Sequence, residues 1–170
     1  GATSNGTCQD CAAGKYSTDM GATSDATCKD CAAGKYYNGT GASLCQDCAA
    51  GKYSTAMGAT SNGTCQDCAA GKYSTAMGAT SDATCQDCGV GKYSADVGAF
   101  SSGNCTRCAP GRYSSVLGAS VCSNTCAMGK YNANSGATDA SACLSCEDGT
   151  SSSPGRDYCS PCTTGQYSLR

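Results

Sequence analysis

The stretch Cys45–Ser61, which reads CQDCAAGKYSTAMGATS, decides the fold of this chain, because residues 65–81 repeat the same seventeen letters. Its pattern of two close cysteines, a glycine, a tyrosine and a second glycine recurs along the 170-residue sequence. Successive copies begin 16 to 21 residues apart. Such a period is typical of an array of small units rather than of a domain with one core.

The 18 cysteines form nine close pairs, and we number the repeats 1 to 9 by these pairs. Eight pairs have the spacing C-x-x-C, and repeat 7 has C-x-x-x-C at Cys122 and Cys126. The repeat boundaries lie near Cys8, Cys28, Cys45, Cys65, Cys85, Cys105, Cys122, Cys143 and Cys159. We therefore predict one continuous array of about nine repeats over residues 1–170. Both ends fall inside the repeat pattern, so we expect a fragment of a longer chain.

Three residues recur, with few exceptions, at fixed distances after the second cysteine of each pair: a glycine, a tyrosine and a second glycine. A glycine, here called the turn glycine, lies three residues on in all nine repeats. A tyrosine follows two residues later in eight repeats, and only Ser151 breaks this rule. A second glycine, here called the loop glycine, lies ten residues after the cysteine in seven repeats, and repeat 8 uses Gly155, one place early. The segment from the loop glycine to the next cysteine varies in length, so it is predicted to be an exposed turn.

The composition excludes a globular enzyme with a single core. Leu, Ile, Val and Phe together number nine residues, against 23 Gly and 18 Cys. A chain this poor in large apolar side chains folds only when it is cross-linked. Glycines separate short extended pieces such as Gly14–Thr18, and no helical apolar period is present. We predict a small disulfide-rich fold, mostly irregular with short β-strands and hairpins, forming an elongated tandem-repeat rod without a single hydrophobic core.

A run of C-x-x-C pairs has three chemical interpretations. Structural zinc uses two such pairs per ion because four thiolates complete a tetrahedron, and nine pairs leave one over. Redox C-x-x-C needs a helix N-terminus to lower the thiol pKa, and the glycine-rich segment that follows provides none. Structural disulfides need an oxidising compartment. We favour disulfides, with zinc as the second interpretation, and we assign no metal and no cofactor.

The spacing also predicts which cysteines pair. A disulfide within C-x-x-C closes a strained ring, whereas joining the second cysteine of one repeat to the first of the next closes loops of 12 to 16 intervening residues. The predicted disulfides are Cys11–Cys28, Cys31–Cys45, Cys48–Cys65, Cys68–Cys85, Cys88–Cys105, Cys108–Cys122, Cys126–Cys143 and Cys146–Cys159. Cys8 and Cys162 are left for flanking repeats.

Sequons support an extracellular or cell-surface location. The N-x-[ST] triplets begin at Asn5, Asn38, Asn62 and Asn104, and we predict N-linked glycans there. Asn104 is the least suitable, because it directly precedes a cysteine that is expected to be bonded. The net charge of −2 without a basic stripe argues against a nucleic-acid partner. No apolar run in the sequence is long enough to span a membrane.

The unit C-x-x-C-x-x-G-x-Y-S…G-A-[ST]-x-C resembles the ephrin-receptor-like cysteine-rich repeat, and more distantly the tumour-necrosis-factor-receptor and EGF-like modules. The resemblance covers nearly the whole chain. Such repeats occur in receptor ectodomains and in large surface proteins of protists and algae, so the resemblance implies a fold more than a function. Repeat 7 departs from the pattern in its cysteine spacing, and repeat 8 departs by carrying Ser151–Gly155 in place of the tyrosine segment.

The repeated tyrosines and the basic residues before them each have a plain and a functional interpretation. Each tyrosine ring is expected to cover a disulfide or the next repeat as a miniature core, rather than to join a ladder that binds a ligand. The Lys or Arg that precedes the tyrosine in seven repeats is expected to form a solvated face rather than a site for a polyanion.

Near-identical tandem repeats favour a mechanical role, since a ligand site usually requires one unit to diverge. We expect a non-catalytic extracellular glycoprotein, a spacer or building block of a surface filament or coat, with neighbouring copies or flanking repeats as partners. The alternative is the ligand-binding stalk of a cell-surface receptor, which predicts an exposed apolar patch around Val97, Phe100 or Val116–Leu117. The sequence has no histidine, and its carboxylates mostly stand singly beside cysteines, so no catalytic residue is assigned.

Overall fold

The structure is a computed structural model that describes residues 8–168. The chain divides into two compact units. Unit 1 comprises Gly1–Cys68 with Ser74–Cys85, and unit 2 comprises Ala69–Tyr73 with Gln86–Arg170. The predicted glycan site at Asn5 lies outside the described residues.

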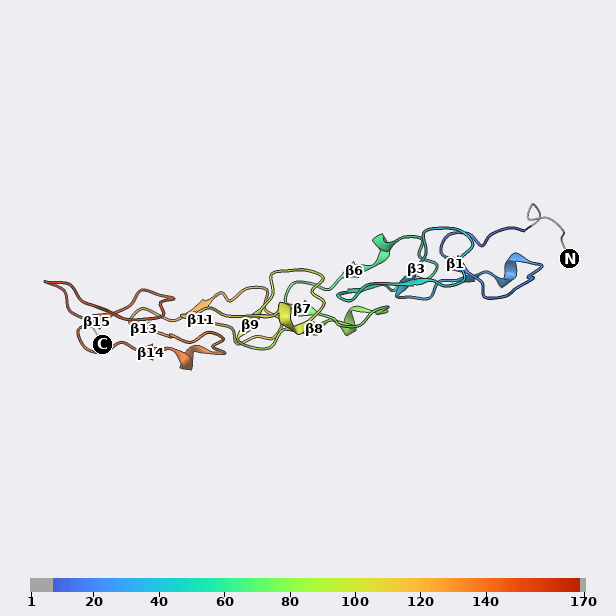
Figure 1. Cartoon of the computed structure of the whole chain (residues 1–170). Helices are drawn as coiled ribbons and strands as arrows, with labels where there is room; N and C mark the ends of the chain where they lie inside the picture. The colour runs from blue at the N-terminus through green and yellow to red at the C-terminus, as the bar shows by residue number, and fades with distance from the viewer. Residues whose placement is uncertain (1–7, 169–170) are drawn as a thin grey trace. The chain divides into compact units, whose positions relative to one another are not determined.

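Unit 1 contains three antiparallel hairpins that follow one another along the chain (Figure 1). Their two-residue strands are β1 (Lys15–Tyr16) with β2 (Lys29–Asp30), β3 (Lys35–Tyr36) with β4 (Gln46–Asp47), and β5 (Lys52–Tyr53) with β6 (Gln66–Asp67). In each hairpin, the first strand holds the Lys-Tyr step of one repeat, and the second holds the two residues between the cysteines of the next. A hairpin therefore joins two consecutive repeats.

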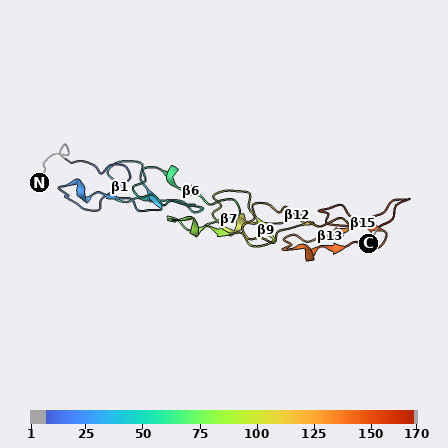
Figure 2. The ribbon, with the colours of Figure 1, turned by 180° about the vertical axis from the view of Figure 1, so that it is seen from behind.

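Unit 2 contains five hairpins of the same kind, which Figure 2 shows from behind. They are β7 (Lys72–Tyr73) with β8 (Gln86–Asp87), β9 (Lys92–Tyr93) with β10 (Thr106–Arg107), β11 (Arg112–Tyr113) with β12 (Asn124–Thr125), β13 (Lys130–Tyr131) with β14 (Leu144–Ser145), and β15 (Thr150–Ser151) with β16 (Ser160–Pro161). Repeat 8 keeps its hairpin although Ser151 replaces the tyrosine. Main-chain pairing, not the aromatic ring, therefore defines the strand.

The length-variable segment has two forms. Its long form holds one 3-10 turn: η2 (Asp25–Thr27), η3 (Asn62–Thr64) and η4 (Asp82–Thr84) in unit 1, and η5 (Ser102–Asn104) and η6 (Ala140–Ala142) in unit 2. Where a side chain caps the turn, as Ser24 and Asp139 do, its oxygen accepts the backbone N–H two residues on. The short forms at 41–45 and 118–122 hold no 3-10 turn. The deletion thus removes a surface turn and leaves the hairpins intact.

Cystines and small residues form the interior of both units. The second cysteines Cys31, Cys48, Cys68, Cys88 and Cys108 are 0 % exposed. The alanines that follow the loop glycines are buried as well: Ala42, Ala59, Ala79, Ala99 and Ala119. The tyrosines of the strands are only half-buried. The predicted disulfide-rich fold of short hairpins without a single hydrophobic core is confirmed, and no helix within residues 8–168 is long and apolar enough to cross a membrane.

Candidate functional site

Eight disulfides link consecutive repeats, and each joins the second cysteine of one repeat to the first of the next. They are Cys11–Cys28, Cys31–Cys45, Cys48–Cys65, Cys68–Cys85, Cys88–Cys105, Cys108–Cys122, Cys126–Cys143 and Cys146–Cys159, with Cα atoms 5.5–5.7 Å apart. This is the pairing that the spacing predicts. The bonded cysteines are not available as thiolate ligands, which removes the basis of the zinc interpretation. Cys8, exposed, and Cys162, half-buried, are unpaired.

Each repeat also bonds to the next through its main chain. The N–H of the turn glycine donates to the carbonyl that follows the strand tyrosine of the next repeat, as Gly34 does to Ser54 over 2.8 Å. The carbonyl of the same glycine accepts from the N–H of the next second cysteine, as Gly34 does from Cys48 over 2.8 Å. Both bonds recur in unit 2, where Gly91 donates to Ser114 and accepts from Cys108. The contact between repeats is therefore a fixed register of backbone bonds.

The loop glycine and the alanine after it occupy a defined place on the preceding repeat, here called the loop seat. Gly58 shows it in unit 1: its N–H donates to the Cys31 carbonyl over 2.7 Å, and Ala59 accepts from the Tyr37 N–H over 3.0 Å. Ala59 also forms a parallel bridge with Tyr36. The bond from loop glycine to second cysteine recurs with lengths of 2.7–2.9 Å at Gly41–Cys11, Gly58–Cys31, Gly78–Cys48, Gly118–Cys88, Gly136–Cys108 and Gly155–Cys126.

The turn glycine closes the loop seat from two repeats away. Its φ is positive, and a Cβ built on it would lie 2.0–2.3 Å from the carbonyl oxygen of a loop glycine two repeats later. The pairs are Gly14–Gly58 and Gly34–Gly78 in unit 1, and Gly71–Gly118, Gly91–Gly136 and Gly111–Gly155 in unit 2. The sequence requires glycine here both for the backbone conformation and for this close approach. The contact between a repeat and the next but one is not predicted from the sequence, since a turn alone already explains a periodic glycine.

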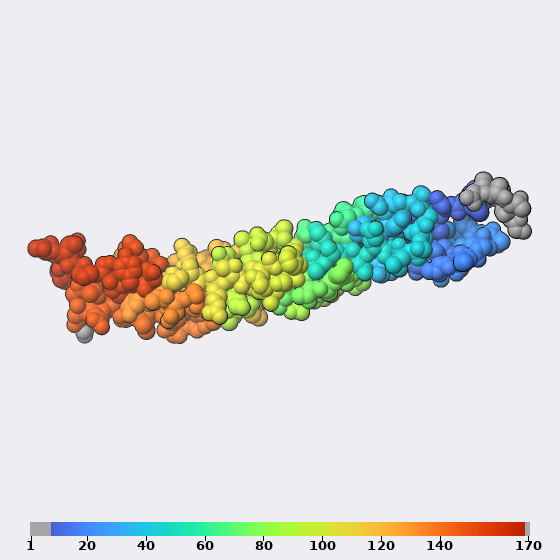
Figure 3. Space-filling model, viewed as in Figure 1, coloured from blue at the N-terminus to red at the C-terminus, as the bar shows by residue number. Residues whose placement is uncertain are grey.

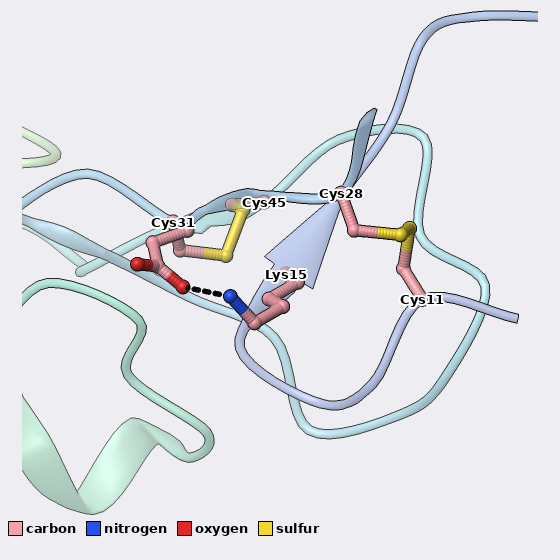
Figure 4. A network of polar contacts seen from close by, with 6 residues as sticks. Cys11, Lys15, Cys28, Cys31 and Cys45 are labelled. Atoms are coloured by element: carbon pink, nitrogen blue, oxygen red, sulfur yellow. Dashed lines mark hydrogen bonds and ion pairs between the residues drawn. A yellow bond between two sulfur atoms is a disulfide. The ribbon is translucent and has the colours of Figure 1, made fainter. Parts of the chain in front are cut away.

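Ion pairs cross the hairpins of repeats 1 to 4. They join Lys15–Asp30, Lys35–Asp47, Lys52–Asp67 and Lys72–Asp87, and Figure 4 shows the first beside the neighbouring disulfides. The side chains are substantially exposed, so each pair contributes little to stability. In unit 2, Arg107 takes the position of the aspartate and lies opposite Lys92. Four of the seven Lys or Arg residues that precede the tyrosine are therefore solvated and paired with an aspartate.

One carboxylate in unit 2 has a shifted pKa. The Ser141 hydroxyl and the Ser141 backbone N–H both donate to the Asp139 carboxylate, and they hold the pKa of Asp139 below its ordinary value. This is an N-cap interaction at the start of η6, and it carries no catalytic geometry.

Two open hollows lie among the described residues of unit 2 near its C-terminal hairpins. One of about 260 Å³ is lined in part by Tyr158 and Cys162. The other, of about 710 Å³, is lined by residues that include Gly129, Cys146 and Ser151. The face of unit 1 shown in Figure 3 has no deep cleft over its described residues. No group of three or more Cys, Asp or Glu side chains within residues 8–168 is arranged to hold a metal ion.

The structure separates the predicted glycan sites into two kinds. Asn38 and Asn62 are exposed, and Asn62 begins the surface turn η3. Asn104 is half-buried, and its side-chain oxygen accepts the Ser101 N–H over 3.2 Å as part of a capping box. The box and the half-burial hold the Asn104 side chain against the turn, so its amide nitrogen is less accessible to a glycosylating enzyme than that of Asn62.

We expect Asn38 and Asn62 to be glycosylated in material from a eukaryotic secretory pathway, and Asn104 to remain largely unmodified. Glycopeptide mass spectrometry before and after enzymatic deglycosylation checks this, since each removed N-glycan converts its Asn to Asp. Equal occupancy at Asn104 and Asn62 would show that the capping box does not protect the site. The absence of a glycan at all four sequons would refute the prediction.

No protein-family model matches this sequence, and a comparison with curated proteins finds no similar one.

Proposed function

We propose that the chain is a non-catalytic structural array of an extracellular glycoprotein, a spacer or building block of a surface filament or coat. The observation that carries the proposal is the repeated contact between neighbours: the same disulfide, hairpin and glycine bonds recur from repeat to repeat in both units. Sixteen bonded cysteines suggest a secreted chain, because disulfides persist in oxidising compartments. Its resemblance to the ephrin-receptor-like repeat is in keeping with such a setting.

A structural role uses these contacts mechanically. Consecutive repeats are joined by a disulfide and by a hairpin, and five of the turn glycines also approach the next repeat but one. Stability in such an array is a sum of local terms, so the number of repeats can change without redesign of a core. The turn segments can also differ in length without disturbing the array, because the 3-10 turns lie outside the paired strands.

The proposal predicts an extended particle in solution and a filament or coat in native material. A compact chain of 170 residues has a radius of gyration of about 15 Å. Small-angle scattering of the array should give a radius of gyration well above this value. Electron microscopy of native material should show the chain within a regular assembly. A compact particle, or an isolated one that binds a soluble ligand, would overturn the structural role.

The receptor stalk is the second candidate function, and one observation favours it. Val97, Phe100 and Leu117 are 64 %, 61 % and 64 % exposed, as a docking patch for a protein ligand would require. However, Met57 and Met77, which precede loop glycines as Val97 and Leu117 do, are equally exposed at 70 % and 68 %. The exposed apolar residue is thus a regular feature of the repeat, and the structural role remains our proposal.

A further inference from the structure

One hairpin of unit 2 carries two cations where its predecessor carries a neutral ion pair. In β7–β8, Lys72 lies opposite Asp87 and bonds to it over 2.7 Å. In β9–β10, Arg107 takes the position of the aspartate and lies opposite Lys92. Residues directly opposite on an antiparallel pair have their side chains on the same face, and like charges there destabilise the pair. An anion bound between Lys92 and Arg107 would remove this repulsion.

The next hairpin along the chain adds a third cation. In β11–β12, Arg112 is the counterpart of Lys92, and the neutral Thr125 stands where an aspartate would neutralise it. Both arginines are exposed, and Lys92 is half-buried. No carboxylate in the described part of unit 2 forms an ion pair with any of the three cations. We call Lys92, Arg107 and Arg112 the basic patch.

The protein itself holds both arginines of the basic patch. The stem of Arg107 lies over the loop glycine Gly136, where its Cδ would be 3.4 Å from an added Cβ. One guanidinium nitrogen of Arg112 donates to the Cys122 carbonyl over 3.1 Å, which leaves its other N–H groups for a ligand. Side chains that are fixed beforehand lose less conformational entropy on binding. A guanidinium also presents paired donors that match two oxygens of a carboxylate or sulfate group.

The segment that leads into β10 carries the predicted glycan site that is least accessible. Asn104 lies three residues before Arg107 and is held in the capping box at η5. The exposed Asn62 instead begins the turn before β6, where Asp67 is paired with Lys52. The glycan expected at Asn62 therefore adjoins a neutral hairpin, and the basic patch is left uncovered.

We propose that the basic patch binds an acidic polysaccharide, a polymer that carries carboxylate or sulfate groups at intervals along its length. This inference rests on the proposed structural function, and it names a partner within the surface coat. The cations belong to successive hairpins, so a polymer can contact all of them, whereas a single small anion contacts one hairpin. A polysaccharide is favoured over a nucleic acid because the whole chain has a net charge of −2 and the patch has few cations for a phosphate backbone.

The first experiment measures binding of the folded chain, with its disulfides intact, to dextran sulfate and to polygalacturonate. Both should bind, uncharged dextran should not, and added salt should weaken the binding because it screens exposed charges. Arg107→Asp should lower the affinity at least about tenfold, since it removes a guanidinium and gives Lys92 an ionic partner. The variant recreates the pair that Lys72 forms with Asp87, so its melting temperature should not fall.

Lys29→Asp is the matched control, because it makes the same change in charge at an exposed lysine of β2 in unit 1. It should leave the affinity within about twofold of that of the unaltered chain, since an exposed charge away from the patch contributes little. Equal losses in Arg107→Asp and Lys29→Asp would show that only the net charge matters, and would overturn the proposal. Tighter binding of a single-stranded DNA or an acidic peptide than of either polysaccharide would also overturn it, because the patch would then fit another class of partner.

The second experiment needs no variant. Acetylation of lysines in the unaltered chain is followed by mass spectrometry with and without dextran sulfate at a concentration well above its Kd. The reaction of Lys92 should slow at least about threefold, as mass action requires of a site that is mostly occupied, while Lys29 reacts at the same rate. An unchanged rate at Lys92 would overturn the proposal.

The two proposals can fail separately. If native material forms filaments or coats but the chain binds neither acidic polysaccharide, the inference fails and the structural function stands. If the chain binds through the basic patch but native material is an isolated receptor, the structural function fails instead.

Discussion

Replacing Gly91 with alanine is expected to destabilise unit 2 by about 3–5 kcal/mol, because it combines two of the mechanisms behind large mutational effects. The φ of Gly91 is +73°, a left-handed conformation that costs an alanine about 1–2 kcal/mol. Its Cβ would also lie 2.3 Å from the carbonyl oxygen of Gly136, which is backbone and has no rotamer to escape into. The loop seat must open or the hairpin must shift. Thermal unfolding of the two proteins measures the lost free energy of unfolding, and amide hydrogen exchange locates the loss in unit 2.

Gly129→Ala is the matched control for this prediction. Gly129 has the same φ of +73° and the same position in its repeat, but a Cβ there meets nothing within 4 Å. It should therefore cost only the conformational term of about 1–2 kcal/mol. The difference between the two variants isolates the steric approach from the backbone conformation. Equal destabilisation of the two variants would mean that glycine is needed at position 91 only for its backbone conformation. The contact with Gly136 would then not stabilise the array.

The covalent and local features of the fold are predictable from the sequence for a physical reason. A disulfide needs Cα atoms within about 7 Å, and a bond within C-x-x-C would be strained, whereas bonds between the second cysteine of one repeat and the first of the next close relaxed loops. The hairpins follow from it, because a bridge between Cys88 and Cys105 brings Lys92–Tyr93 beside Thr106–Arg107. Covalent spacing thus fixes the strand register before any side chain packs.

The contacts beyond the nearest repeat are not predictable in the same way. A periodic glycine indicates a turn, and the letter is the same whether or not a second backbone lies against it. The interior is also different from the one expected, since buried cysteines and alanines such as Cys88 and Ala99 form it while the tyrosines stay half-buried. An alanine carries little periodic signal in a chain rich in small residues. The approach of Gly91 to Gly136 is therefore a feature of the structure that the sequence pattern does not indicate.

Reduction of all eight disulfides is expected to unfold both units, since the large apolar side chains are few and many of them are exposed. A disulfide that closes a loop of about 15 residues contributes about 3 kcal/mol, so eight of them exceed the whole stability of an ordinary domain. The backbone bonds between repeats, such as Gly91 N–H to the Ser114 carbonyl, should then lose their protection. Hydrogen exchange with mass spectrometry before and after reduction measures this directly.

Removing one bridge tests whether the stabilisation is local. Cys88→Ser with Cys105→Ser should expose the amides of hairpin β9–β10 and of the seat around Gly118, while those near Cys146–Cys159 keep their protection. The matched control is Cys8→Ser with Cys162→Ser, which replaces the same number of cysteines and breaks no disulfide between the described repeats. A cooperative loss of all protected amides after removal of the single bridge would contradict the array of local terms. Persistence of the hairpins after full reduction would show instead that backbone pairing alone holds them.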